Sequence, residues 1–213
     1  MSPLPRFLRL PAERQEAILR VARGHFAEQG PEGASYNRII EAAGFSKTAA
    51  YQYFDGRDDL LAAVLDDVLA RLLGVLGPWE PAPDAAAFRA ALETGTRELS
   101  AHLRAHPDDL ALAEVAAARP AGAVWAAWFE ALVDDGLRLG VIRSDLDRSL
   151  LVAATAAVLR AGDSWALAAW RDGREPDTGQ VWELLRGLWG GPRDGGGNGT
   201  GRRDGDGGGR DAD

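Results

Sequence analysis

Cysteine is absent from this sequence and lysine nearly so, because 23 of the 24 cationic side chains are arginine. The absence of cysteine excludes disulfides, thiolate metal sites and thiol nucleophiles, and it fits a reducing compartment. No segment alternates apolar and polar residues over the length of a strand. No uninterrupted apolar run reaches the roughly 18 residues of a membrane span, and the N-terminus lacks a signal-peptide core. We therefore expect a cytoplasmic protein without a membrane partner.

The chain of 213 residues is 46% apolar and 26% charged, so it can bury a core. Its net charge of −8 argues against a protein that coats nucleic acid in general. Residues 1–54 nevertheless carry seven cations and five anions, which makes them locally basic. If the protein contacts an anionic partner, this first quarter is the expected place.

Helical spacing of apolar residues recurs throughout, so we expect an all-α fold of about nine helices. Gly30-Pro31 should end the first helix, and Ser35, Ser46 and Thr178 are candidate N-caps. The Gly-rich, charged residues 190–213 cannot bury enough surface to offset their ordering entropy and should be disordered. The predicted helices cover about 11–29, 35–44, 47–54, 58–76, 84–103, 107–120, 124–140, 147–170 and 178–189.

Residues 35–54 combine a short helix, a glycine-containing turn and a second short helix. Apolar residues such as Ile39, Ala50 and Phe54 can pack the two helices together, which leaves polar residues near both helix starts. Helix N-termini suit phosphate groups, and polar side chains of this kind read bases from a major groove. On spacing alone, a plain helical hairpin with a solvated face explains the segment equally well.

Residues 14–65 resemble the N-terminal domain of the TetR/AcrR family of bacterial transcriptional regulators. The resemblance implies a homodimer bound to a palindromic DNA operator, usually a repressor released by a small molecule. The remainder is similar only in architecture, as an all-helical ligand-binding and dimerisation bundle. The matching residues are Arg14, Ile18, Leu19, Ala22, Phe26, Gly30, Ser35, Ile39, Ala43-Gly44-Phe45-Ser46-Lys47, Tyr51, Phe54 and Asp59-Leu60-Leu61.

The resemblance implies a helix-turn-helix DNA-binding domain over 1–57 and a ligand-binding and dimerisation domain over 58–189, and the composition adds a disordered tail over 190–213. It implies a sequence-specific regulator with an unknown small-molecule effector. A regulator without such an effector, constitutive or controlled by a protein partner, is the alternative. Departures such as Ala50, where the family usually has leucine, bear on the operator sequence. The DNA contacts carried over by position are Ser35, Tyr36, Asn37, Lys47, Thr48, Tyr51, Gln52, Tyr53 and Arg57.

Aromatic residues of the second domain could line an apolar ligand pocket, although each taken alone is as well explained as core or interface. His102 and Asp163 are the candidate polar contacts. We expect a dimer through 147–189, with a seam of Leu159, Leu185, Leu188 and Trp189. The candidate pocket aromatics are Trp125, Trp128, Phe129, Trp165 and Trp170.

Glu98, His102 and His106 share one helical face at a spacing that could hold a metal. Because no cysteine or clear fourth ligand supports such a site, we expect a polar or solvated face without metal. The sequence has no nucleophile elbow, phosphate-binding loop, Rossmann glycine pattern or zincin helix. We therefore expect neither enzyme activity nor a cofactor.

Overall fold

The computed structural model describes residues 3–119 and 122–190, and this part of the chain contains ten α-helices and no strand. The all-α prediction is confirmed, with one helix more than the approximate count. The disordered tail is predicted for residues 190–213, of which 191–213 lie outside the described residues. The helices are α1 (Pro5–Leu8), α2 (Ala12–Gly33), α3 (Tyr36–Ala42), α4 (Lys47–Tyr53), α5 (Arg57–Leu76), α6 (Ala85–Ala105), α7 (Pro107–Ala117), α8 (Ala123–Arg138), α9 (Arg148–Arg171) and α10 (Gly179–Trp189).

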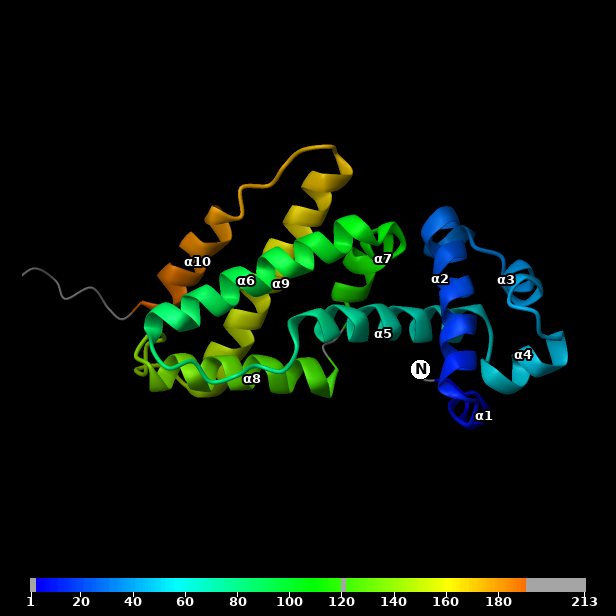
Figure 1. The fold of residues 1–213 in the computed structure, drawn as a ribbon, viewed down its shortest axis with the longest axis horizontal. Coiled ribbons are helices and arrows are strands. Elements are labelled where there is room, and N and C mark those ends of the chain that lie inside the picture. The colour runs from blue at the N-terminus through cyan, green and yellow to red at the C-terminus, as the bar shows by residue number, and fades with distance from the viewer. Residues whose placement is uncertain (1–2, 120–121, 191–213) are drawn as a thin grey trace, which may run out of the picture.

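The molecule is elongated, with a small N-terminal head at one end and a larger bundle at the other (Figure 1). Helices α1–α4 gather in the head, and α6–α10 form the bundle. The long helix α5 runs from the head into the bundle, so it contributes to both parts. A displacement of α5 in the bundle would therefore reach the head directly.

Helix α1 and the end of α2 depart from the prediction. The four residues of α1 are too few to show a helical period, and Phe7 anchors them in the core. Gly30 takes a left-handed φ of 76° and kinks α2, but the helix resumes and ends only at Gly33. Pro31 has no amide proton to donate but suits the first turn of the resumed helix, which explains why Gly30-Pro31 is a kink and not an end.

The three predicted caps differ in outcome. The Ser46 hydroxyl accepts a hydrogen bond from the Ala49 amide at 3.2 Å, as an N-cap should. Ser35 and Thr178 occupy N-cap positions, but neither side chain accepts a capping hydrogen bond. At α10 the Asp177 carboxylate accepts from the Gly179 amide instead, at 3.0 Å.

One core unites the head with the neighbouring parts of α5 and α7. Phe26, Ile39 and Phe54 from the head are fully buried together with Leu60 and Leu112. The head therefore packs continuously onto the bundle. A second core, formed by α6 and α8–α10, is centred on Phe88, Leu132, Ile142, Leu151, Leu185 and Trp189.

Helix α9 is the one helix in the described part of the chain that is long and apolar enough to cross a membrane by length and composition. Only 22% of its most apolar window is buried. Arg160 and Asp163 interrupt the apolar residues, which is why no continuous apolar run stands out in the sequence. The helix packs against α10, where the Trp189 indole donates to the buried Thr155 hydroxyl at 2.9 Å. Its composition is that of a bundle helix with one uncovered face.

Candidate nucleic-acid interface and ligand cavity

The turn between α3 and α4 is built as the sequence predicts. Gly44 has φ of 70°, a left-handed conformation that side-chain-bearing residues rarely adopt. Ile39, Ala50 and Phe54 are fully buried beneath the two helices. Five of the predicted DNA contacts are exposed on the opposite side, so they are free to meet a partner: Asn37, Lys47, Thr48, Tyr51 and Gln52.

Lys47 and Thr48 occupy the first turn of α4. The first amides of a helix lack intrahelical acceptors and carry a partial positive charge, which the Lys47 ammonium reinforces. Tyr51, one turn later, is 61% exposed, which is unusual for a large aromatic side chain. This combination suits contact with phosphate groups and base edges.

Tyr36 is half-buried and joins α3 to α4. Its ring lies edge-on to Tyr51 with 6.1 Å between centroids, and its hydroxyl donates to the Phe54 carbonyl at 3.5 Å. Burial, together with nearby Tyr51, Asp59 and Asp55, raises the Tyr36 pKa to about 12. Tyr36 is thus a neutral donor that fixes the two helices relative to each other.

Three other predicted contacts are engaged within the head or hold partly enclosed positions. Tyr53 is half-buried and packs edge-on against Phe7 and Phe45, because the side chain follows the inner face of α4. Ser35 is half-buried at the start of α3. Arg57 donates to the Pro31 and Glu32 carbonyls at 2.6 and 2.7 Å, which ties the end of α2 to the start of α5.

The bundle encloses a cavity of about 540 Å³, within the range of small-molecule sites. Trp125, Trp128, Phe129 and Asp163 line it, together with Trp170. Sequence reasoning missed Trp79 and Trp182, so five of the seven tryptophans lie on the wall. Trp182 lies on an apolar face of α10 that the helical spacing of the sequence indicates. Trp79 lies in a proline-rich linker, where no helical spacing indicates the direction of its side chain.

Trp165 and His102 are not among the lining residues, contrary to the prediction. Trp165 is 38% exposed, because the wall follows one face of α9 and this residue falls on another. The lining residues of α9 are Leu159, Gly162, Asp163, Ala166, Leu167 and Trp170, at the spacing of a single helical face.

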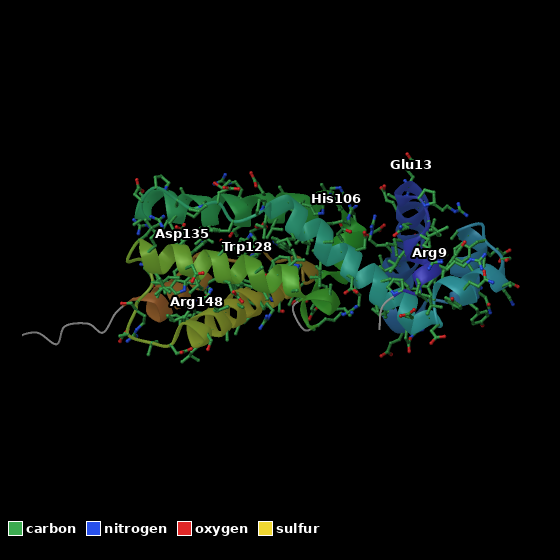
Figure 2. The ribbon with its side chains drawn as sticks, turned by 90° about the horizontal axis from the view of Figure 1, so that it is seen from below. Arg9, Glu13, His106, Trp128, Asp135 and Arg148 are labelled. Atoms are coloured by element: carbon green, nitrogen blue, oxygen red, sulfur yellow. The ribbon has the colours of Figure 1, made fainter. Side chains whose placement is uncertain are left out.

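His102 belongs to a polar cluster instead. Its Nε2 lies 2.8 Å from Asp109 Oδ2, and its ring stacks on His106 at 4.0 Å. The structure thus groups His102 and His106 with Asp109, within 4.8 Å of one another, in place of Glu98. Arg71 and Arg23 contact the same carboxylate at 3.0 and 3.3 Å, and their charges oppose a metal cation. Figure 2 shows His106 in the part of the bundle that faces the head.

Two indole N–H groups fix the aromatic wall. Trp128 donates to the Gly77 carbonyl and Trp79 to Asp135 Oδ2, both at 3.1 Å. Burial alone would raise the Asp135 pKa, but hydrogen bonds from Ala82, Arg138 and Trp79 lower it below its usual value. Figure 2 shows Trp128 and Asp135 on α8, with Asp135 toward the end away from the head. The wall is therefore largely preformed.

The head has the geometry of a helix-turn-helix domain carried on a helical bundle with an internal cavity. Residues 18–64 match the family described as bacterial regulatory proteins, tetR family. This match covers the head beyond the start of α2 together with the first part of α5, so the N-terminal part of the chain is similar to the TetR family.

Curated relatives match the N-terminal part. The HTH-type transcriptional repressor AcnR of Corynebacterium glutamicum is 36% identical over 66 residues, which is 31% of this chain and 35% of that protein. AcnR of Corynebacterium diphtheriae is 30% identical over 95 residues, 45% of this chain and 42% of the relative. The chain thus spans less than half the length of these relatives, both of which are transcriptional repressors.

A solved structure extends the likeness to the bundle. The fatty acid degradation regulator FadR from Bacillus halodurans superposes with a TM-score of 0.58 at 17% identity, over 84% of this chain and 99% of that one. This similarity confirms the fold of both parts.

Proposed function

We propose that the protein is a sequence-specific transcriptional repressor that binds a DNA operator through α3 and α4. The observation that carries the proposal is the exposed polar face of these helices above a buried core. On this proposal Lys47, Thr48 and Gln52 contact bases or phosphates, Asn37 contacts the backbone, and Tyr51 packs against the groove. Such a repressor works in the cytoplasm, where its DNA is.

Four of the predicted DNA contacts are partly enclosed, and we propose different roles for them. Tyr36, Tyr53 and Arg57 position the reading helices through their internal contacts. Arg57 uses Nη1 for both carbonyl contacts and Nη2 for Asp58 Oδ1 at 3.0 Å, so of its five N–H groups those not used in these contacts can still meet a phosphate. The small Ser35 hydroxyl at the start of α3 can do the same.

We propose that the chain is divided into the three predicted parts. The head includes residues 1–57, the ligand-binding and dimerisation domain 58–189, and the remaining residues form the tail. Helix α5 begins at Arg57, directly at the boundary. Because α5 also packs against α2, it is the route by which the second domain acts on the first.

A second copy of the chain is proposed to cover α9 and α10. One recognition helix reads few base pairs, and a two-fold dimer doubles the site. Trp165 and Leu150 of α9 and Leu184 of α10 are exposed apolar residues on these helices. The predicted seam residues are placed differently: Leu185 and Trp189 are buried in the core of the protomer, Leu188 packs against that core, and Leu159 lines the cavity.

Leu184→Glu tests the dimer by light scattering of the full chain. The variant should become monomeric, because a charge in the interface would be desolvated. Leu8→Glu is the matched control, since Leu8 is similarly exposed but lies in the head. A Leu184→Glu protein that remains dimeric would place the interface elsewhere.

The cavity is proposed to hold a small apolar effector that weakens DNA binding. Leu72 and Leu76 of α5 lie on its wall, so a bound molecule contacts the helix that reaches the head. A shift of α5 would change the spacing of the two recognition helices, which must stay near one helical turn of DNA, about 34–36 Å.

Selection of duplexes from a random-sequence library by the full-length protein tests the function. We expect enrichment of one motif with two-fold symmetric half-sites about one turn apart. A library without enrichment after repeated rounds, with folded protein, would refute sequence-specific DNA binding.

A further inference from the structure

The charged residues on the cavity wall all have one sign. Glu80, Glu98 and Asp163 are lining residues, and among the described residues the wall contains no arginine, lysine or histidine. Arginine is otherwise abundant in this chain. The cavity therefore has a negative potential within an apolar surround, which attracts a cation and repels an anion.

Asp163 lines the cavity from α9, where its side chain is accessible to solvent. Gly162 and Ala166 line the same stretch of α9, and the exposed Asp163 side chain is open to a molecule that enters the cavity. No hydrogen bond or ion pair links Asp163 to another described residue. The surrounding protein raises its pKa to about 6, so at neutral pH it is still mostly ionised. A charge in this position lacks a partner, and a bound cation would supply one.

The aromatic wall adds a second attraction for positive charge. Cations are stabilised over the faces of tryptophan rings. Trp170 already makes such a contact, with the Arg104 guanidinium carbon 5.1 Å from its ring centroid. Trp125 and Trp128 lie with their ring centroids 6.3 Å apart and can enclose an organic cation together with Phe129.

We propose that the cavity binds an amphipathic organic cation, an aromatic or polycyclic body with one ammonium-type charge placed beside Asp163. The proposal rests on the proposed function of this cavity as the effector site. It excludes carboxylate ligands, which would face three acids and no basic residue in the described wall.

Two pairs of probes with similar shape and opposite charge test the proposal by calorimetric titration of the full-length protein. The larger pair is tetraphenylphosphonium and tetraphenylborate, and the smaller is 1-naphthylmethylammonium and 1-naphthoate. In at least one pair the cation should bind about tenfold more tightly than the anion. Asp163→Asn should remove most of that preference, whereas Asp163→Glu should retain it. Asp145→Asn, which removes an exposed acid from the loop before α9, should bind as the wild type.

Preference for the anion, or equal affinity within both pairs, would overturn the proposal. So would an unchanged cation affinity in a folded Asp163→Asn protein. Operator affinity, measured with and without the cation, separates this ligand proposal from the proposed function. If the cation binds as described but leaves operator affinity unchanged, the ligand class stands and release by ligand fails. Failure of the duplex selection would likewise leave the calorimetric result intact.

Discussion

The Arg23 guanidinium of α2 and the Asp109 carboxylate of α7 form a buried ion pair between head and bundle, with Nε and Oδ1 3.3 Å apart. Their side chains are 9% and 1% exposed. Arg71 of α5 and His102 of α6 contact the other carboxylate oxygen at 3.0 and 2.8 Å. One carboxylate therefore joins four helices, and the adjacent Leu72 and Leu103 line the cavity. This cluster connects the cavity with the head.

Replacing Asp109 with Asn should destabilise the fold strongly. The substitution removes the anion that Arg71 and His102 contact, while Arg23 keeps its ion pair with Asp67 at 2.8 Å, and a lost hydrogen bond to a charged group costs about 1.5–3 kcal/mol. Urea unfolding followed by circular dichroism measures the loss. Asp145→Asn is the control, because the Arg143–Asp145 pair lies near the surface and should contribute less than about 1 kcal/mol. Equal losses in the two variants would show that the cluster does not hold the helices together.

Gly136 should tolerate no side chain. A Cβ there would lie 2.5 Å from Ile142 Cδ1 and 3.2 Å from Phe88 Cζ, and both partners are fully buried. Gly136→Ala should therefore cost about 1–3 kcal/mol through overpacking. Gly74→Ala is matched, because Gly74 is an exposed position of α5 with nothing within 4 Å of an added Cβ, and it should stabilise by about 0.5–1 kcal/mol. Thermal unfolding checks both signs, and a stabilised Gly136→Ala would mean that α8 and the following loop are packed loosely.

Asp163→Asn should stabilise the unliganded protein in a pH-dependent way. The carboxyl is accessible from the cavity, but the packed protein around it partly desolvates it and raises its pKa from 3.8 to about 6, so the folded state binds its proton more tightly than the unfolded state does. Ionisation thus lowers stability as the pH rises through this window, and the penalty is complete above pH 6. At neutral pH the free energy of unfolding of the variant should exceed that of the wild type by on the order of 1 kcal/mol, allowing for screening by water in the cavity. Below the ordinary carboxyl pKa of 3.8 the two proteins should not differ for this reason. If the free energies of unfolding of the two proteins differ by the same amount at every pH in this range, the raised pKa of Asp163 is contradicted.

The helices were predictable because each has a local signal. Apolar spacing and stop residues place most boundaries within a few residues, and Ser46 acts as the expected cap. The kink at Gly30 was not predictable, since whether α2 resumes depends on packing around Pro31. The four-residue α1 is too short for any period to appear.

The sites were predictable only where side-chain direction follows from helix position. The exposed starts of α3 and α4 follow from the buried spacing of Ile39, Ala50 and Phe54. Periodicity cannot tell a cavity wall from a core or an interface, because all three are apolar. For that reason Trp165 was assigned to the cavity and Leu185 to the dimer seam, and neither lies there. The partners of Asp109 come from three other helices and leave no pattern in the sequence.

The most direct test of the account is the affinity of the Lys47→Ala protein for the selected operator, measured by fluorescence anisotropy beside the wild type. Lys47 is exposed on the first turn of α4, and its loss should cost about 1–3 kcal/mol at a base it contacts, or weaken binding evenly with a shallower salt dependence if it meets a phosphate. Arg89→Ala, which removes an exposed cation from α6 in the bundle, should bind DNA as the wild type does. A folded Lys47→Ala protein with undiminished operator affinity would contradict the claim that α4 reads DNA.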